Sequence, residues 1–137
     1  TTNSPAGYSL AIKASTDPAL TATEGSFANY TPAGTADYVW SIPETSSEFG
    51  MSPEGSDIVA AFRDNGAQCG VGNLDTEDRC WGPVQTTDTT ISGTGVGIHP
   101  AGAATDVRFR AEIGSARSSP QKPGSYQAEL TVTAVAF

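Results

Sequence analysis

The fold is decided by TDVRFRAEIG, residues 105–114. Apolar Val107, Phe109, Ala111 and Ile113 alternate in this stretch with charged Arg108, Arg110 and Glu112. A period of two is the pattern of a β-strand that has one face in the core and the other in solvent. We therefore expect the apolar set to point inward and the two arginines to meet acidic residues on neighbouring strands.

The same alternation recurs in three further segments. They are 7–14 with Tyr8, Leu10 and Ile12 on one face, 37–43 with Tyr38, Trp40 and Ile42, and 125–136 with Tyr126, Ala128, Leu130, Val132 and Ala134. Shorter strands are expected near 22–28, 48–52 and 88–92. Short strands separated by Gly, Pro and Ser turns are typical of all-β folds. We predict an antiparallel β-sandwich, of jelly-roll or Ig-like type, with Trp40 and Trp81 as core or loop anchors.

One short helix is expected between these strands, near residues 56–66. Ser56 suits an N-cap, and Asn65-Gly66 provides a left-handed end. Between them Ile58, Val59, Ala61 and Phe62 form an apolar stripe. Such a helix would lie across an edge or end of the sandwich and would not form a layer.

The size and charge of the chain narrow its function. A chain of 137 residues is long enough for one domain with a substantial core, and we expect a single domain, either whole or lacking an N-terminal strand. Its 7 basic and 15 acidic residues give a net charge of −8. A basic surface for nucleic acid is therefore not expected, and neither is membrane insertion.

The two cysteines, Cys69 and Cys80, flank a loop rich in Gly and Asp. No CxxC pair and no second Cys/His cluster accompanies them, so a structural zinc site is not expected. A disulfide is the main interpretation, and two free thiols are the alternative. A disulfide would imply an oxidising compartment, and we expect an extracellular or cell-surface location.

The loop between the cysteines is the best candidate for a metal site. Asp75, Glu77 and Asp78 gather there, and calcium prefers hard oxygen ligands of this kind. The spacing is not that of an EF-hand. Neutralisation of the acidic residues by Arg79, or a plain acidic turn, are the alternatives. We expect no cofactor, and calcium bound by Asp75, Glu77 and Asp78 is the alternative.

Catalytic residues are not recognisable in the sequence. The one histidine, His99, lies before Pro100 in a Gly-rich turn, and no nucleophile motif accompanies it. We therefore predict that the chain is not an enzyme.

Four segments together carry a resemblance. They are TNSPAGYSL at 2–10, DIVAAFRDNG at 57–66 with the following Cys69 and Cys80-Trp81, HPAG at 99–102 with VRFR at 107–110, and PGSYQAELTVTA at 123–134. The chain resembles uncharacterised secreted β-sandwich surface proteins of small-genome, candidate-phylum bacteria. It is similar more loosely to sandwich-type subunits of pili and matrix fibres. The resemblance implies export and a β-sandwich, and it brings no catalytic residues.

Proteins of this kind usually carry one more strand before the segment at 2–10, so the resemblance implies an open sandwich edge. The alternative is that this strand lies outside the given sequence. We expect a structural subunit of an extracellular filament or surface layer, assembled from copies of itself by strand donation or edge pairing. The residues expected at the contact are Tyr8, Leu10, Ile12, Tyr126, Leu130 and Val132. The alternative is a binding or adhesion module for a host-surface protein or glycan that uses the Cys69–Cys80 loop.

Overall fold

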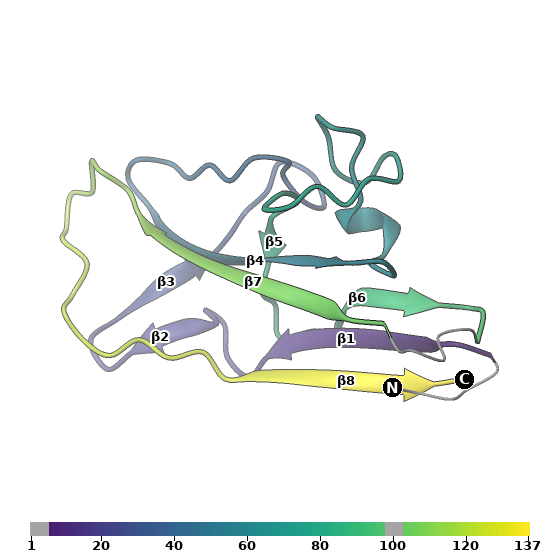
Figure 1. Ribbon diagram of the computed structural model, residues 1–137. Coiled ribbons are helices and arrows are strands. Elements are labelled where there is room, and N and C mark those ends of the chain that lie inside the picture. The colour runs from purple at the N-terminus through teal and green to yellow at the C-terminus, as the bar shows by residue number, and fades with distance from the viewer. Residues whose placement is uncertain (1–5, 98–102) are drawn as a thin grey trace.

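The computed structural model describes residues 6–97 and 103–137 and is nearly all β (Figure 1). The elements are β1 (Tyr8–Ala14), β2 (Leu20–Ala22), β3 (Gly25–Asn29), β4 (Ser47–Gly55), η1 (Ala60–Phe62), β5 (Gly82–Pro83), β6 (Thr89–Thr94), β7 (Thr105–Ile113) and β8 (Leu130–Ala136). Among the described residues, no helix is long and apolar enough to cross a membrane. The predicted all-β sandwich is confirmed, and the strand pairs are antiparallel as predicted except that of β3 with β4, which is parallel.

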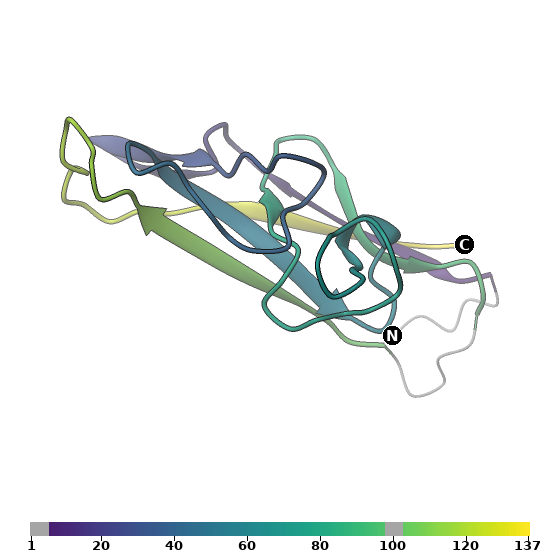
Figure 2. The same ribbon diagram turned by 90° about the horizontal axis from the view of Figure 1, so that it is seen from above.

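Two sheets form the layers of the sandwich. The first has the order β6-β1-β8, and both outer strands run antiparallel to β1. In the second sheet β4 is central, with β7 along one edge and β3 and β5 along the other, and β2 extends the sheet beyond β3. Figure 2 shows β4 and β7 as the nearer layer, with β8 partly behind them.

The core lies between the two sheets. Its buried side chains include Ile12, Ala14, Phe27, Phe49, Met51, Ile58, Phe62, Val84 and Ile91. The strands that supply them come from both sheets, so burial of this apolar surface holds the layers together.

Strand β4 is also covered on its outer face, by a second cluster of Tyr30, Trp40 and Trp81. The rings of Tyr30 and Trp40 stack with centroids 4.2 Å apart, and Trp81 meets Trp40 edge-on at 5.3 Å. A Cβ atom at Gly50 would lie 2.8 Å from the Tyr30 Cβ and 2.9 Å from the Trp40 ring. The absence of a side chain at Gly50 therefore lets the aromatic cluster lie against β4.

Most of the predicted strands are present, but the one predicted over 37–43 is wrong. Only Asp37 makes a strand-like bridge, to Trp81. The alternation of apolar residues in this segment has another cause, because Trp40 packs on the outer face of β4 and Ile42 packs beside it. Trp40 and Trp81 are both buried, as expected.

The predicted short helix is present only as the 3-10 turn η1. Residues before η1 bond instead to the edge of β6, where the Val59 N–H donates to the Ile91 carbonyl at 3.1 Å and Ile58 bridges Ser92. These bonds hold 57–59 in an extended path, so only Ala60–Phe62 are left to turn.

Candidate functional site

Strand β7 has its inner face partly in solvent. In the register with β4, Phe109 lies opposite Met51 and Ile113 lies opposite Ser47, so the apolar face of β7 continues the buried face of β4. The sequence predicted this inward direction correctly. However, Phe109 is 44% exposed and Ile113 is 53% exposed, because β7 is an edge strand and nothing in the described residues covers it fully.

Strand β8 shows the same feature in the other sheet. Val132 lies opposite the buried Ile12 of β1, yet it is 57% exposed. Figure 1 shows β7 at the edge of one layer and β8 at the lower edge of the other. We call the exposed inner faces of these two edge strands, with Phe109, Ile113 and Val132, the open side. The sequence missed it because alternation reports which face a residue occupies and says nothing of what covers that face.

The free edge of β8 carries unused backbone groups. The Ser15 N–H donates to the Glu129 carbonyl at 2.9 Å, and the Phe137 N–H donates to the Gly7 carbonyl at 3.1 Å. Because bonding alternates along an antiparallel ladder, the odd-numbered residues of β8 are the ones that form hydrogen bonds with β1. The even-numbered residues, 130 to 136, direct their N–H and C=O groups away from β1, where the described part of the chain places no strand.

The sequence of β8 does not protect this edge. Its seven residues, LTVTAVA, contain no charge and no proline, and its register with β1 is uninterrupted. Charges, prolines and bulges are the features that usually keep edge strands from pairing with other chains. Strand β8 therefore has the chemistry of an edge that accepts another strand.

The edge of β7 differs because it is charged. Arg108 bonds Glu54 of β4 at 3.0 Å and Glu77 of the stapled loop, which confirms the expected acidic neighbours for this residue. Arg110 instead bonds Glu112 of its own strand at 2.8 Å, and its guanidinium lies 5.2 Å from the Trp40 ring centroid.

The six residues predicted to form an assembly contact are not equivalent. Ile12 is buried in the core, and Leu10 and Leu130 pack against the core. The Tyr8 hydroxyl donates to Asp57 at 3.0 Å, and burial is the main cause that raises its pKa. The structure therefore leaves these four side chains engaged within the protomer.

Tyr126 is also engaged within the protomer, since it meets the Phe27 ring edge-on at 5.0 Å and donates a hydrogen bond to the Lys122 carbonyl at 2.7 Å. Val132 alone of the predicted six is exposed. The assembly contact itself stays a prediction, and the sequence did not name the exposed Phe109 or Ile113 as contact residues.

The loop between the cysteines is closed by the predicted disulfide. Cys69 and Cys80 are bonded, with their Cα atoms 5.5 Å apart, so the alternative of two free thiols is wrong for this structure. A disulfide is consistent with an oxidising environment. The loop borders a hollow of about 380 Å³ that Asp37 and Tyr38 also line.

Asp64 is the organising residue of this loop. Its buried carboxylate accepts hydrogen bonds from the Gly66 N–H at 2.7 Å, the Thr76 N–H at 3.0 Å and the Thr76 hydroxyl at 3.0 Å. Burial alone would raise the pKa of Asp64, but these bonds from Thr76 and Gly66 outweigh it, so the pKa is lowered. The carboxylate therefore stays ionised and ties together both ends of the loop.

The three predicted calcium ligands do not converge. Asp75 accepts the Gly55 N–H at 2.8 Å, and Glu77 pairs with Arg108. The Asp78 backbone, with φ of 62°, bonds Glu54 through its N–H at 2.7 Å. In the described residues no three His, Cys, Asp or Glu side chains form a group that could hold a metal, so calcium remains a prediction without a ligand cluster.

The single histidine, His99, lies outside the described residues. No family model matches the chain, and neither a curated protein nor a solved structure was found that matches it. The resemblance to bacterial surface proteins, the absence of enzyme activity and the use of the stapled loop in adhesion therefore stay predictions.

Proposed function

We propose that this chain is a structural subunit of an extracellular filament or cell-surface layer, in which a β-strand of a second copy adds to the free edge of β8. The observation that carries the proposal is the open side of the sandwich. There the free edge of β8 is uncharged and its inner-face residue Val132 remains exposed, and the other sheet leaves Phe109 and Ile113 of β7 exposed as well. A strand added along β8 would satisfy the backbone groups of that edge and extend the apolar inner face beside Val132.

The proposed occupant is a second copy of the chain, because its strands fit the β8 edge and that edge avoids repulsion between the acidic copies. Each copy carries a net charge of −8, so most contacts between copies would bring acidic residues together. Strand β8 contains no charged residue. An added strand must also present an apolar side chain at every second position, and the strands of this chain have that pattern.

The kind of pairing decides the kind of assembly. Two β8 strands paired with each other form a two-fold contact, which closes as a dimer. A filament forms when β8 pairs with a different strand of the next copy, because such a contact leaves a free edge at each end. The proposal is the second arrangement, and the disulfide agrees with assembly outside the cell.

The test uses the direction of the backbone groups. In the ladder, the Ala134 N–H points away from β1, so Ala134→Pro removes a donor from the free edge and none from the pairing with β1. Ala134→Val is the matched control, since it keeps the donor and enlarges the side chain. We expect electron microscopy and sedimentation to show filaments of the wild-type chain and of Ala134→Val, and folded monomers of Ala134→Pro.

Two results would contradict the proposal. Wild-type chains that stay monomeric at all concentrations would contradict self-assembly. Wild-type chains that form closed dimers and nothing larger would contradict filament formation. Filaments of Ala134→Pro with an unchanged circular dichroism spectrum would show that the contact lies elsewhere.

A further inference from the structure

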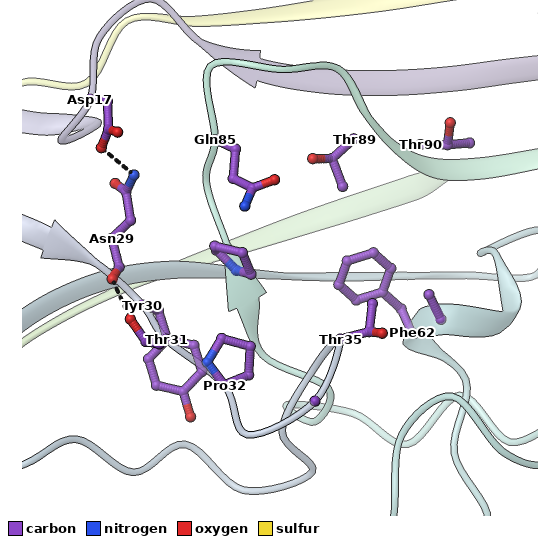
Figure 3. A pocket seen from close by; sticks show the side chains of 13 residues that line it. Asp17, Asn29, Tyr30, Thr31, Pro32, Thr35, Phe62, Gln85, Thr89 and Thr90 are labelled. Carbon is purple, nitrogen blue, oxygen red and sulfur yellow. Dashed lines mark hydrogen bonds between the residues drawn. The ribbon is translucent and has the colours of Figure 1, made fainter.

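A cleft of about 660 Å³ lies on the side of the sandwich away from the open side, between the end of β3, the loop that follows it, η1 and the start of β6. Its volume is in the range of small-ligand sites. Figure 3 shows Asp17 and Asn29 at one end and Phe62 at the other. Gln85 and Thr89 lie along one wall, and Thr35 lies on the opposite side.

The cleft has an apolar lining that resists collapse. The Phe62 ring is only 4% exposed and packs in the core, and the rings of Pro32 and Pro83 continue the surface between the walls. Prolines have few conformations, so this surface is largely preformed. It offers C–H groups and a ring edge to the apolar face of a ligand.

Fixed polar groups stand at the end of the cleft near β3. The Asn29 side-chain oxygen accepts the Ala19 N–H at 2.9 Å, and its amide nitrogen donates to an Asp17 carboxylate oxygen at 2.9 Å. Both ends of the Asn29 amide are thereby oriented. One amide hydrogen of Asn29 and the second carboxylate oxygen of Asp17 remain without a partner among the described residues, so a donor and a strong acceptor lie side by side.

The walls add further groups that are free to bind. The side chains of Gln85, Thr89 and Thr35 have no hydrogen-bond partner within 6–97 and 103–137. Each of them both donates and accepts. Hydroxyl groups of a ligand also donate and accept, so this set is complementary to a molecule that carries several hydroxyls around an apolar face.

The charges and the prolines narrow the class of ligand. Asp17 is the one charged residue that lines the cleft among those described, and no Lys or Arg stands there to bind phosphate or sulfate. A peptide that adds as a strand needs main-chain donors, and Pro32 and Pro83 have none. An uncharged ligand held by side chains fits these constraints.

We infer that this cleft binds a neutral saccharide. The pair Asp17 and Asn29 holds two adjacent hydroxyls, Gln85 and Thr89 bind hydroxyls along the sugar edge, and the surface of Pro32, Pro83 and Phe62 meets the apolar face of the ring. The site lies away from β8, so it does not depend on the proposed assembly, and the stapled loop takes no part in it.

The experiment is an NMR titration of the labelled chain with four neutral trisaccharides: cellotriose, maltotriose, mannotriose and N,N′,N″-triacetylchitotriose. It is made at a concentration where sedimentation shows monomers, and inorganic phosphate is the anionic control. We expect at least one trisaccharide to shift the amide signals of 29–35 and 85–90, and phosphate to shift neither group. Gln85→Ala should weaken binding about threefold to tenfold, the effect of one neutral hydrogen bond.

Gln127→Ala is the matched variant, because Gln127 is also exposed but lies beside β2, away from the cleft lining. Its affinity should equal that of the wild-type chain. The inference is overturned if none of the four trisaccharides shifts the cleft signals, if the shifts fall elsewhere, or if Gln85→Ala binds as well as Gln127→Ala. Tighter binding of phosphate than of any trisaccharide would also overturn it.

Discussion

Phe49 and Phe109 lie on neighbouring strands with ring centroids 5.8 Å apart and ring planes only 14° from parallel, yet one is in the core and the other is not. Phe49 is 6% exposed and Phe109 is 44% exposed. The two side chains share one face of the sheet, so the layer that covers the first ends before it covers the second. This difference marks the boundary of the core on the open side.

Truncation of these two residues should therefore have unequal effects. Phe49→Ala should lower the free energy of unfolding by about 3–5 kcal/mol, as expected for a buried phenylalanine. Phe109→Ala should cost about half of that or less, because a large part of its ring is already in solvent. Chemical denaturation at a concentration that keeps the chain monomeric measures both.

Phe109 should matter more for assembly than for the stability of the single chain. If an added strand covers the open side, Phe109→Ala loses an apolar contact in the assembly and raises the concentration at which filaments form. Val135→Ala is the control, because Val135 is on the opposite face of β8 and is similarly exposed, at 49%. An equal effect of both variants on filament formation would contradict a contact on the inner face.

The carboxylate of Asp64 predicts a weakness in acid. Its pKa is lowered from the ordinary value of 3.8 in the folded chain, so its hydrogen bonds contribute fully above that pH and are lost as the pH falls through the folded value. Asp64→Asn replaces an acceptor by a donor and should lower the free energy of unfolding at neutral pH by about 2 kcal/mol. Its stability should also fall less steeply below pH 3.8 than that of the wild-type chain.

Asp88→Asn is the control for Asp64→Asn. Asp88 is exposed, and within the described part of the chain its one ion pair is a long contact with Lys13, at 3.8 Å. Asp88→Asn should have the same free energy of unfolding as the wild-type chain, both at neutral pH and below pH 3.8. If Asp64→Asn were as stable as the wild-type chain, the loop would not depend on the ionised carboxylate of Asp64.

Much of the fold was predictable because alternation is a local signal. The strands β1, β4, β6, β7 and β8 lie where the sequence predicted them. The strand predicted over 37–43 is wrong for the same reason: the signal is local. Tyr38, Trp40 and Ile42 alternate there, but the segment has no partner strand. Whether an alternating segment pairs depends on chain far away in sequence, here on the cluster formed with Tyr30 and Trp81.

The candidate sites were less predictable, because they depend on the path of loops. Asp64 stands before Asn65-Gly66, a turn signal, but its bond to Thr76 requires the loop to return. The saccharide cleft joins residues from 17 to 90, and none of them forms a motif. Cys69 and Cys80 were found from sequence because a lone pair of cysteines in such a loop has few other uses.

The hydroxyl of Tyr30 predicts a loss of stability in alkali. Burial is the main cause that raises its pKa from 10.0 to about 12, and its hydrogen bond to Asp37 adds to the effect. The unfolded chain releases this proton near pH 10 and the folded chain keeps it, so stability is unaffected below pH 10.0 and falls as the pH rises toward 12. The loss should reach about 2–3 kcal/mol over this range.

Tyr30→Phe isolates this effect, because it keeps the ring against Trp40 and removes the ionisable group. We expect this variant to be about 1 kcal/mol less stable at neutral pH, since the bond to Asp37 is lost. Between pH 10.0 and 12 its stability should fall less than that of the wild-type chain. Tyr126→Phe is the control, as the Tyr126 hydroxyl bonds a backbone carbonyl near the surface. Denaturation curves measured across this range give the free energy of unfolding of each variant. If the wild type and Tyr30→Phe lost stability equally, Tyr30 would ionise as readily in the folded chain as in the unfolded one.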